Sequence, residues 1–163
     1  MPYFRLFKRA LCLLVLLSVV LTAASCHRAP SARQILGGLL RELSLRGAPY
    51  SSLAGEGEEG YARPGLFEEL YPATEEHVLE YAVYLGSGLF AVRECAVLVC
   101  YTEYDAKIAL ASLEKRLELL AGIAASAELE MPEGAFARRC GRVAVLFALE
   151  GAMEAEGYFK SVL

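Results

Sequence analysis

The sequence contains few of the side chains from which hydrolytic active sites are usually built. It has two histidines, His27 and His77, and one aspartate, Asp105. A Ser-His-Asp triad needs an acid that orients the histidine base, whereas we expect Asp105 to cap a helix. A Gly-x-Ser-x-Gly elbow is also missing, because the Gly-Ser-Gly at 86–88 lacks the spacing. These absences argue against a serine hydrolase.

An excess of basic residues is also lacking. The 163 residues include 16 Lys and Arg against 20 Asp and Glu, which gives a net charge of −4. Nonspecific nucleic-acid binding needs a basic surface, so we expect no nucleic-acid partner. The chain is 56% hydrophobic and holds nine tyrosines and seven phenylalanines. Its length and composition therefore predict one packed domain rather than a disordered chain.

Much of the apolar content lies at the N-terminus. Arg5, Lys8 and Arg9 precede an uncharged run of 15 residues at 10–24. A basic head, a short apolar run and small residues at its end are typical of a secretory signal peptide. The run is shorter than the roughly 20 residues of a membrane-spanning helix. We therefore predict that residues 1–25 are a signal peptide that is removed.

The residues before Cys26 resemble a bacterial lipobox, in which the cysteine sulfur carries diacylglycerol. They are small, Ala23-Ala24-Ser25, although Ala23 replaces the usual leucine. Two acyl chains would anchor the protein stably. The alternative is an ordinary signal peptide in which Cys26 is incidental. We predict a lipid-anchored lipoprotein on the extracytoplasmic face of a bacterial membrane, with a tether at 26–34 and one domain at 35–163.

Removal of the signal peptide concentrates the net charge in one segment. The mature chain would hold 13 basic and 20 acidic residues, and residues 54–80 alone hold eight glutamates and one arginine. Such a segment favours a cationic partner and is repelled by anionic lipid. Calcium loops use Asp and Asn at regular spacing, so we predict no metal and no cofactor. The candidate acidic binding face consists of Glu68, Glu69, Glu75, Glu76 and Glu80. A solvated acidic loop and helix face explains the same residues.

Hydrophobic periodicity predicts an α+β fold with a mostly antiparallel sheet of about four strands covered by helices. We expect a helix from about Ser31 to Gly47, a loop at 48–64 and a short helix at 66–71. Strands follow at 78–85 and 90–101, and the second is apolar on both faces, which is typical of a central strand. A long helix at 106–124, capped by Thr102, a hairpin at 136–149 and a last helix at 151–162 complete the prediction.

The cysteines do not predict a disulfide scaffold, because a domain of this length has a large enough core without one. Cys95 and Cys100 differ in strand parity, so their side chains point to opposite faces of the sheet. They can therefore neither bond to each other nor share one zinc ion. A bridge from Cys140 to one of them requires neighbouring strands, and we expect buried free thiols instead.

From about Ser31 onward the chain resembles an uncharacterised bacterial lipoprotein family, domain of unknown function 4358. The resemblance rests on five stretches, at 75–84, 93–98, 105–107, 113–117 and 141–146. The Ala-rich end of the long helix, at 119–129, departs from the polar pattern of the family. The resemblance implies a lipid-modified cysteine followed by one such domain, and no known activity.

These observations leave three functional hypotheses. The favoured one is a noncatalytic binding or interaction module, held at the membrane by Cys26, with an unknown protein or cell-envelope partner. A glutamate-dependent cell-envelope hydrolase would need two or more of the five glutamates in one deep pocket. A structural scaffold subunit would need the apolar stripe at 106–124 to be exposed. Tyr81, Tyr84, Tyr101 and Tyr104 either line a binding face or pack across strands.

Overall fold

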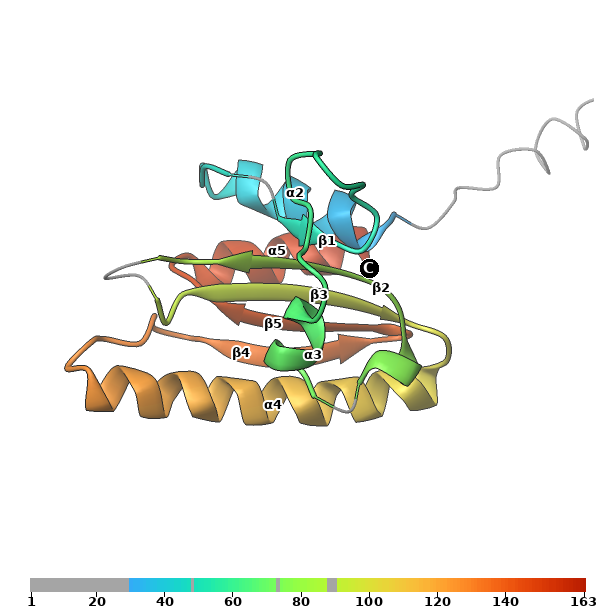
Figure 1. The fold of residues 1–163 in the computed structure, drawn as a ribbon. Helices are drawn as coiled ribbons and strands as arrows, with labels where there is room; N and C mark the ends of the chain where they lie inside the picture. The colour runs from blue at the N-terminus through green and yellow to red at the C-terminus, as the bar shows by residue number, and fades with distance from the viewer. Residues whose placement is uncertain (1–29, 48, 73, 88–90) are drawn as a thin grey trace, which may run out of the picture.

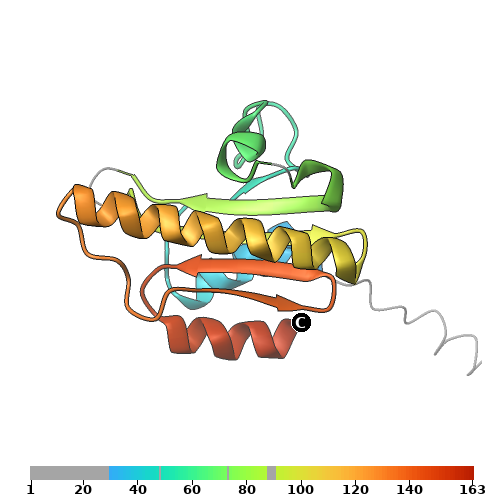
Figure 2. The ribbon, with the colours of Figure 1, turned by 90° about the horizontal axis from the view of Figure 1, so that it is seen from below.

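The computed structural model describes residues 30–47, 49–72, 74–87 and 91–163, which form one α+β domain. Its five-stranded sheet has the order β1-β2-β3-β5-β4, and every neighbouring pair is antiparallel. Helix α4 covers one face, and helices α2 and α5 cover the other (Figure 1, Figure 2). The predicted fold class is confirmed, with one strand more than expected. The predicted signal peptide and Cys26 lie outside the described residues.

Strand β3 (Glu94–Cys100) is the central strand of the sheet, between β2 (Val78–Leu85) and β5. Its alternate side chains enter two separate cores, with Leu98 facing α4 and Val97 facing α2 and α5. Both are fully buried. The prediction of a central strand covered on both faces is therefore confirmed, because an apolar run without alternation needs cover on each side.

Strand β2 begins with an irregularity that moves one leucine out of the core. The pairing of β2 with β3 shifts register between Val78 and Glu80. Val78 packs on the α4 side, whereas Leu79 is 54% exposed. The simple alternation placed Leu79 on the same face as Tyr81 and Val83, and this placement is wrong because a bulge reverses the parity of a strand.

The predicted hairpin at 136–149 is formed by β4 (Phe136–Cys140) and β5 (Val143–Ala148). Its two-residue connection begins with Gly141, whose φ of +53° is a left-handed value that favours glycine. Strand β4 is the last strand in the sheet order, so its outer edge has no strand beside it in the part of the chain that the structure describes.

Helix α4 (Glu103–Ser126) begins where predicted, because the Thr102 hydroxyl accepts the Asp105 backbone N–H at 3.1 Å. Asp105 does not complete a capping box, since its carboxylate accepts from the Thr102 hydroxyl instead. The predicted stripe faces the sheet. Ala106, Leu113 and Leu120 are fully buried there, so the exposed stripe that the scaffold hypothesis needs is not present.

The opposite face is covered by α2 (Ala32–Glu42) and α5 (Ala152–Val162). Helix α2 starts with a complete capping box between Ser31 and Gln34. This start agrees with the helix that hydrophobic periodicity predicted from about Ser31. Helix α5 follows Gly151, as predicted, at a φ of +91°.

Three short elements complete the fold. Strand β1 (Tyr50–Ser51) lies within the predicted loop at 48–64 and pairs with β2. Helix α3 (Leu66–Leu70) confirms the predicted short helix, and the 3₁₀ helix η1 (Glu75–His77) leads into β2. None of the helices among the described residues is both long and apolar enough to cross a membrane.

Cys95, Cys100 and Cys140 are all free. Cys95 and Cys100 lie in opposite cores, as strand parity predicts. Strand β5 separates β4 from β3, so no bridge forms between Cys140 and either of them. The prediction of buried thiols holds for the two β3 cysteines and is wrong for Cys140, which is exposed at the end of an edge strand.

We expect a thiol reagent to distinguish these three cysteines. Burial raises the pKa of Cys100 to about 11 and that of Cys95 further still, so neither provides thiolate at neutral pH. In a mature lipoprotein that lacks Cys12 and has Cys26 acylated, the native protein should therefore label once, at Cys140, and the unfolded protein three times, counted by mass spectrometry. Cys140→Ser should abolish the native labelling. A second native label would contradict the burial of β3.

Candidate functional site

An apolar cavity of about 290 Å³ lies between strand β4 and helix α5. The floor is made by four apolar side chains, Phe136, Val145, Phe159 and Leu163. Small-molecule and side-chain sites are concave and mostly apolar, with few polar groups at the mouth. This cavity has that composition, although its volume is at the lower end of the usual range.

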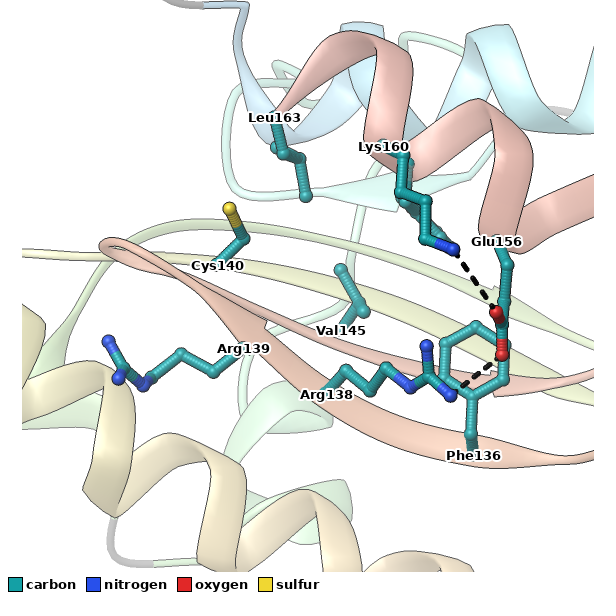
Figure 3. A pocket seen from close by; sticks show the side chains of 9 residues that line it. Phe136, Arg138, Arg139, Cys140, Val145, Glu156, Lys160 and Leu163 are labelled. Atoms are coloured by element: carbon teal, nitrogen blue, oxygen red, sulfur yellow. Dashed lines mark ion pairs between the residues drawn. The ribbon is translucent and has the colours of Figure 1, made fainter.

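Alternate residues of β4 face this cavity. Phe136, Arg138 and Cys140 lie on the α5 side of the strand, whereas the Arg139 side chain points away (Figure 3). Arg139 instead approaches Glu103 of α4, at 3.8 Å. The period of two in a strand therefore divides the two neighbouring arginines between the two faces of the sheet.

The mouth of the cavity carries two cations and one carboxylate (Figure 3). Arg138 Nη2 lies 2.7 Å from Glu156 Oε1, and Lys160 Nζ lies 3.8 Å from Glu156 Oε2. The Arg138 and Lys160 side chains are more than half exposed, so water screens both pairs and they are weak. These three side chains thus give the mouth a net positive charge. Separating the two ion pairs costs little free energy.

The free edge of β4 adjoins the cavity. Cys140 and Val143 flank the two-residue connection and therefore form the hydrogen-bonded pair that closes the hairpin. Because hydrogen-bonded pairs alternate, Ala137 and Arg139 direct their backbone N–H and C=O groups away from β5. Unpaired backbone N–H and C=O groups along a strand edge can form hydrogen bonds with another extended chain.

A charged cluster is buried beneath the groove between α3 and α4. Glu94 is 1% exposed at the start of β3, and both of its oxygens accept from Arg116, the shortest contact being 2.6 Å. The buried Tyr71 hydroxyl donates to Glu94 at 2.5 Å. Burial and the charge of Glu94 raise the pKa of Tyr71. Burial lowers the pKa of Arg116, but hydrogen bonds and the charge of Glu94 more than offset this. Glu94, Arg116 and Tyr71 thus have hydrogen-bond partners within the cluster, which indicates a structural role.

The fold brings His77 and Asp105 together, although nothing in the sequence indicated that these two residues are in contact. His77 Nδ1 lies 2.8 Å from Asp105 Oδ1. Hydrogen bonds from Thr102 and then from His77 lower the pKa of Asp105. Among the described residues the histidine ring makes no hydrogen bond to a hydroxyl or thiol. The pair therefore has an oriented base without a nucleophile.

The five glutamates of the predicted acidic face do not converge on one cavity. Glu69 pairs with Arg63 at 2.5 Å, and this hydrogen bond lowers the pKa of Glu69. Glu80 lies on the other face of the sheet and accepts from the Ala32 backbone N–H at 2.6 Å. The groove beside α4 contains Glu69, and the hollow beside α2 contains Glu80, each without another of the five.

Two of the other three acidic residues lie close to Tyr81. Glu68 and Glu75 act on Tyr81, whose pKa is raised first by burial and then by these charges. Glu76 is exposed on η1. The four tyrosines also separate, since Tyr81 stacks on Phe67 at 4.3 Å whereas Tyr101 and Tyr104 are exposed. A single acidic or tyrosine-lined pocket is therefore not formed by these residues.

One further pattern escaped the sequence analysis. Residues 55–60 spell Gly-x-Gly-x-x-Gly, the fingerprint of dinucleotide-binding turns. That fingerprint needs a strand before it and a helix directly after it. Here it follows the two-residue β1, and α3 begins only at Leu66. It also carries three glutamates, which repel phosphate, so the loop does not match the function of the fingerprint.

Comparison of the chain with family models, curated proteins and solved structures finds no match. The resemblance to domain of unknown function 4358 therefore stays a prediction. The function is argued below from the residues and their geometry.

Proposed function

We propose that the chain is a lipid-anchored extracytoplasmic lipoprotein whose domain is a noncatalytic binding module. The anchor part rests on the sequence around Cys26. The observation that carries the binding part is the open edge of β4 beside an apolar cavity. A partner of unknown identity, from a protein or the cell envelope, would add an extended segment to the sheet there.

The geometry of the edge indicates what this segment contains. Outward backbone groups at Ala137 and Arg139 would pair with its main chain, as in strand addition. One apolar side chain of the segment would enter the cavity between β4 and α5. The net positive mouth formed by Arg138, Lys160 and Glu156 favours an acidic residue beside that side chain.

The two alternatives receive less support. A glutamate-dependent hydrolase needs an acid and a second carboxylate across one bond, at most about 10 Å apart. Glu69 and Glu80 lie on opposite faces of the sheet, and each lines a different cavity. A scaffold subunit that uses the stripe of α4 would have to expose side chains that pack on the sheet.

Photo-crosslinking in the native membrane tests the binding edge. A photoreactive residue in place of Lys160, at the cavity mouth, is expected to give a discrete protein adduct, and one in place of Lys115 on α4 is not. Ala137→Pro removes one outward N–H and should lower the yield about tenfold, which corresponds to about one lost hydrogen bond. Ala137→Val keeps the N–H and should retain the adduct.

The variants also separate binding from folding. Proline is tolerated on edge strands, so Ala137→Pro should unfold at nearly the same temperature as the unchanged protein. Equal adducts from positions 160 and 115 would contradict the proposal. So would an Ala137→Pro variant that folds and crosslinks as efficiently as Ala137→Val.

A further inference from the structure

The described chain begins at one end of the sheet, beside a hollow of about 700 Å³. The start of α4 and the turn between β4 and β5 lie at this same end in both views (Figure 1, Figure 2). Pro30 and Ser31 line the hollow together with apolar and basic side chains. We define the tether end as Leu53, Leu79, Val99, Tyr101 and Arg142.

The tether end exposes large apolar side chains. Leu53 is 53% exposed, Leu79 54% and Tyr101 52%. The bulge at the start of β2 is the reason that Leu79 enters neither core. A cluster of exposed apolar side chains beside a basic group is typical of an interaction surface.

Two of the charged groups that line the hollow are already engaged within the domain. The carboxylate of Glu80 is already bound at the N-terminus of α2, where the helix dipole favours it. Arg33, which also lines the hollow, lies 3.7 Å from Glu58. Arg142 donates to the Tyr101 carbonyl at 3.4 Å, and no carboxylate among the described residues lies within ion-pair distance of it.

The length of chain before the domain decides what can cover this surface. Ser31 follows Cys26 by five residues, which span at most about 18 Å when fully extended. If Cys26 is acylated, Ser31 cannot lie farther than this from the bilayer, and Ser31 lines the same hollow as Leu53, Leu79, Val99 and Arg142. The shortness of the connection thus favours the membrane over a distant partner.

We propose that the tether end docks on the bilayer that holds the lipid anchor. Leu53, Leu79 and Tyr101 enter the boundary between headgroups and acyl chains, and Arg142 binds lipid phosphate. This inference rests on the proposed anchoring at Cys26 and adds a second membrane contact to it. The sheet extends away from the tether end, and β4 meets this end only at its turn with β5, so most of the edge of β4 lies beyond the proposed contact (Figure 2).

Tryptophan fluorescence tests the docking, because the sequence contains no tryptophan. Leu79→Trp places the only indole at the tether end. Leu119→Trp is the matched control, since Leu119 is also 54% exposed but lies on α4. Each full-length lipoprotein is reconstituted into vesicles of phosphatidylethanolamine and phosphatidylglycerol whose acyl chains carry bromine near the headgroup. Flotation of the vesicles measures anchoring, and bromine quenching measures depth.

We expect both variants to float. The indole of Leu79→Trp should emit further to the blue, and be quenched severalfold more strongly, than the indole of Leu119→Trp. Flotation with equal or no quenching in the two variants would overturn the docking and leave the anchor intact. Blue-shifted but unquenched emission from Leu79→Trp would show that protein covers the tether end, either the tether itself or a second copy, and would also overturn it. Failure of both variants to float would overturn the anchor and the docking together.

Discussion

Replacement of Cys26 by alanine is expected to abolish incorporation of labelled fatty acid and to change the electrophoretic mobility of the protein. The sulfur of Cys26 is the atom that would carry diacylglycerol, and alanine offers no nucleophile in its place. Each buried CH₂ group contributes about 0.8 kcal/mol to membrane binding, so that one acyl chain holds a protein marginally and two hold it stably. If Cys26 carries these chains, the substitution removes the contribution of both to membrane binding.

Cys140→Ala is the matched control for this experiment. Cys140 is an exposed free cysteine at the end of β4, outside the pattern of small residues that precedes Cys26. The control should keep the label, the mobility and the membrane fraction of the unchanged protein. A Cys26→Ala variant that stays in the membrane fraction with unchanged mobility would contradict the anchor, and with it the predicted localisation.

The fold could be predicted where hydrophobic periodicity is strong. The apolar run in β3 predicted a central strand, and the spacing from Ala106 to Ala124 predicted α4, because burial of a face or a stripe imposes these periods. Strand β1 was not predicted, because a strand of two residues is too short to show a hydrophobic alternation. The exposure of Leu79 was missed because a bulge depends on the partner strand and leaves no local signal.

The candidate site was harder to predict than the fold. The cavity joins β4 to α5, and its lining residues are separated along the sequence by a whole strand. The pairing of His77 with Asp105 depends on how η1 meets the start of α4. One signal was available, because Glu94 precedes the apolar run of β3 and a charge at a buried position requires a partner. The identity of that partner, Arg116, follows only from the packing of α4.

Glu94→Gln is expected to destabilise the domain by about 3–5 kcal/mol, as measured by urea unfolding. The amide has the shape of the carboxylate and still accepts from the Tyr71 hydroxyl, so the packing of β3 is kept. The guanidinium of Arg116, whose side chain is 15% exposed, then lacks its counter-charge. A buried ion that loses its partner retains the full desolvation penalty, which is larger than the net contribution of the intact pair.

Two further variants distinguish this explanation from a general intolerance of the core. Arg63→Met breaks an arginine–glutamate pair of similar geometry with Glu69, but both partners are 59% exposed. It should change the free energy of unfolding little, because water solvates the remaining carboxylate. The double variant Glu94→Gln with Arg116→Met removes both charges and should be more stable than Glu94→Gln alone. Arg116→Met measured alone completes the comparison. A double variant whose loss equals the sum of the two single losses would show that the ion pair is not the cause, since independent sites are additive.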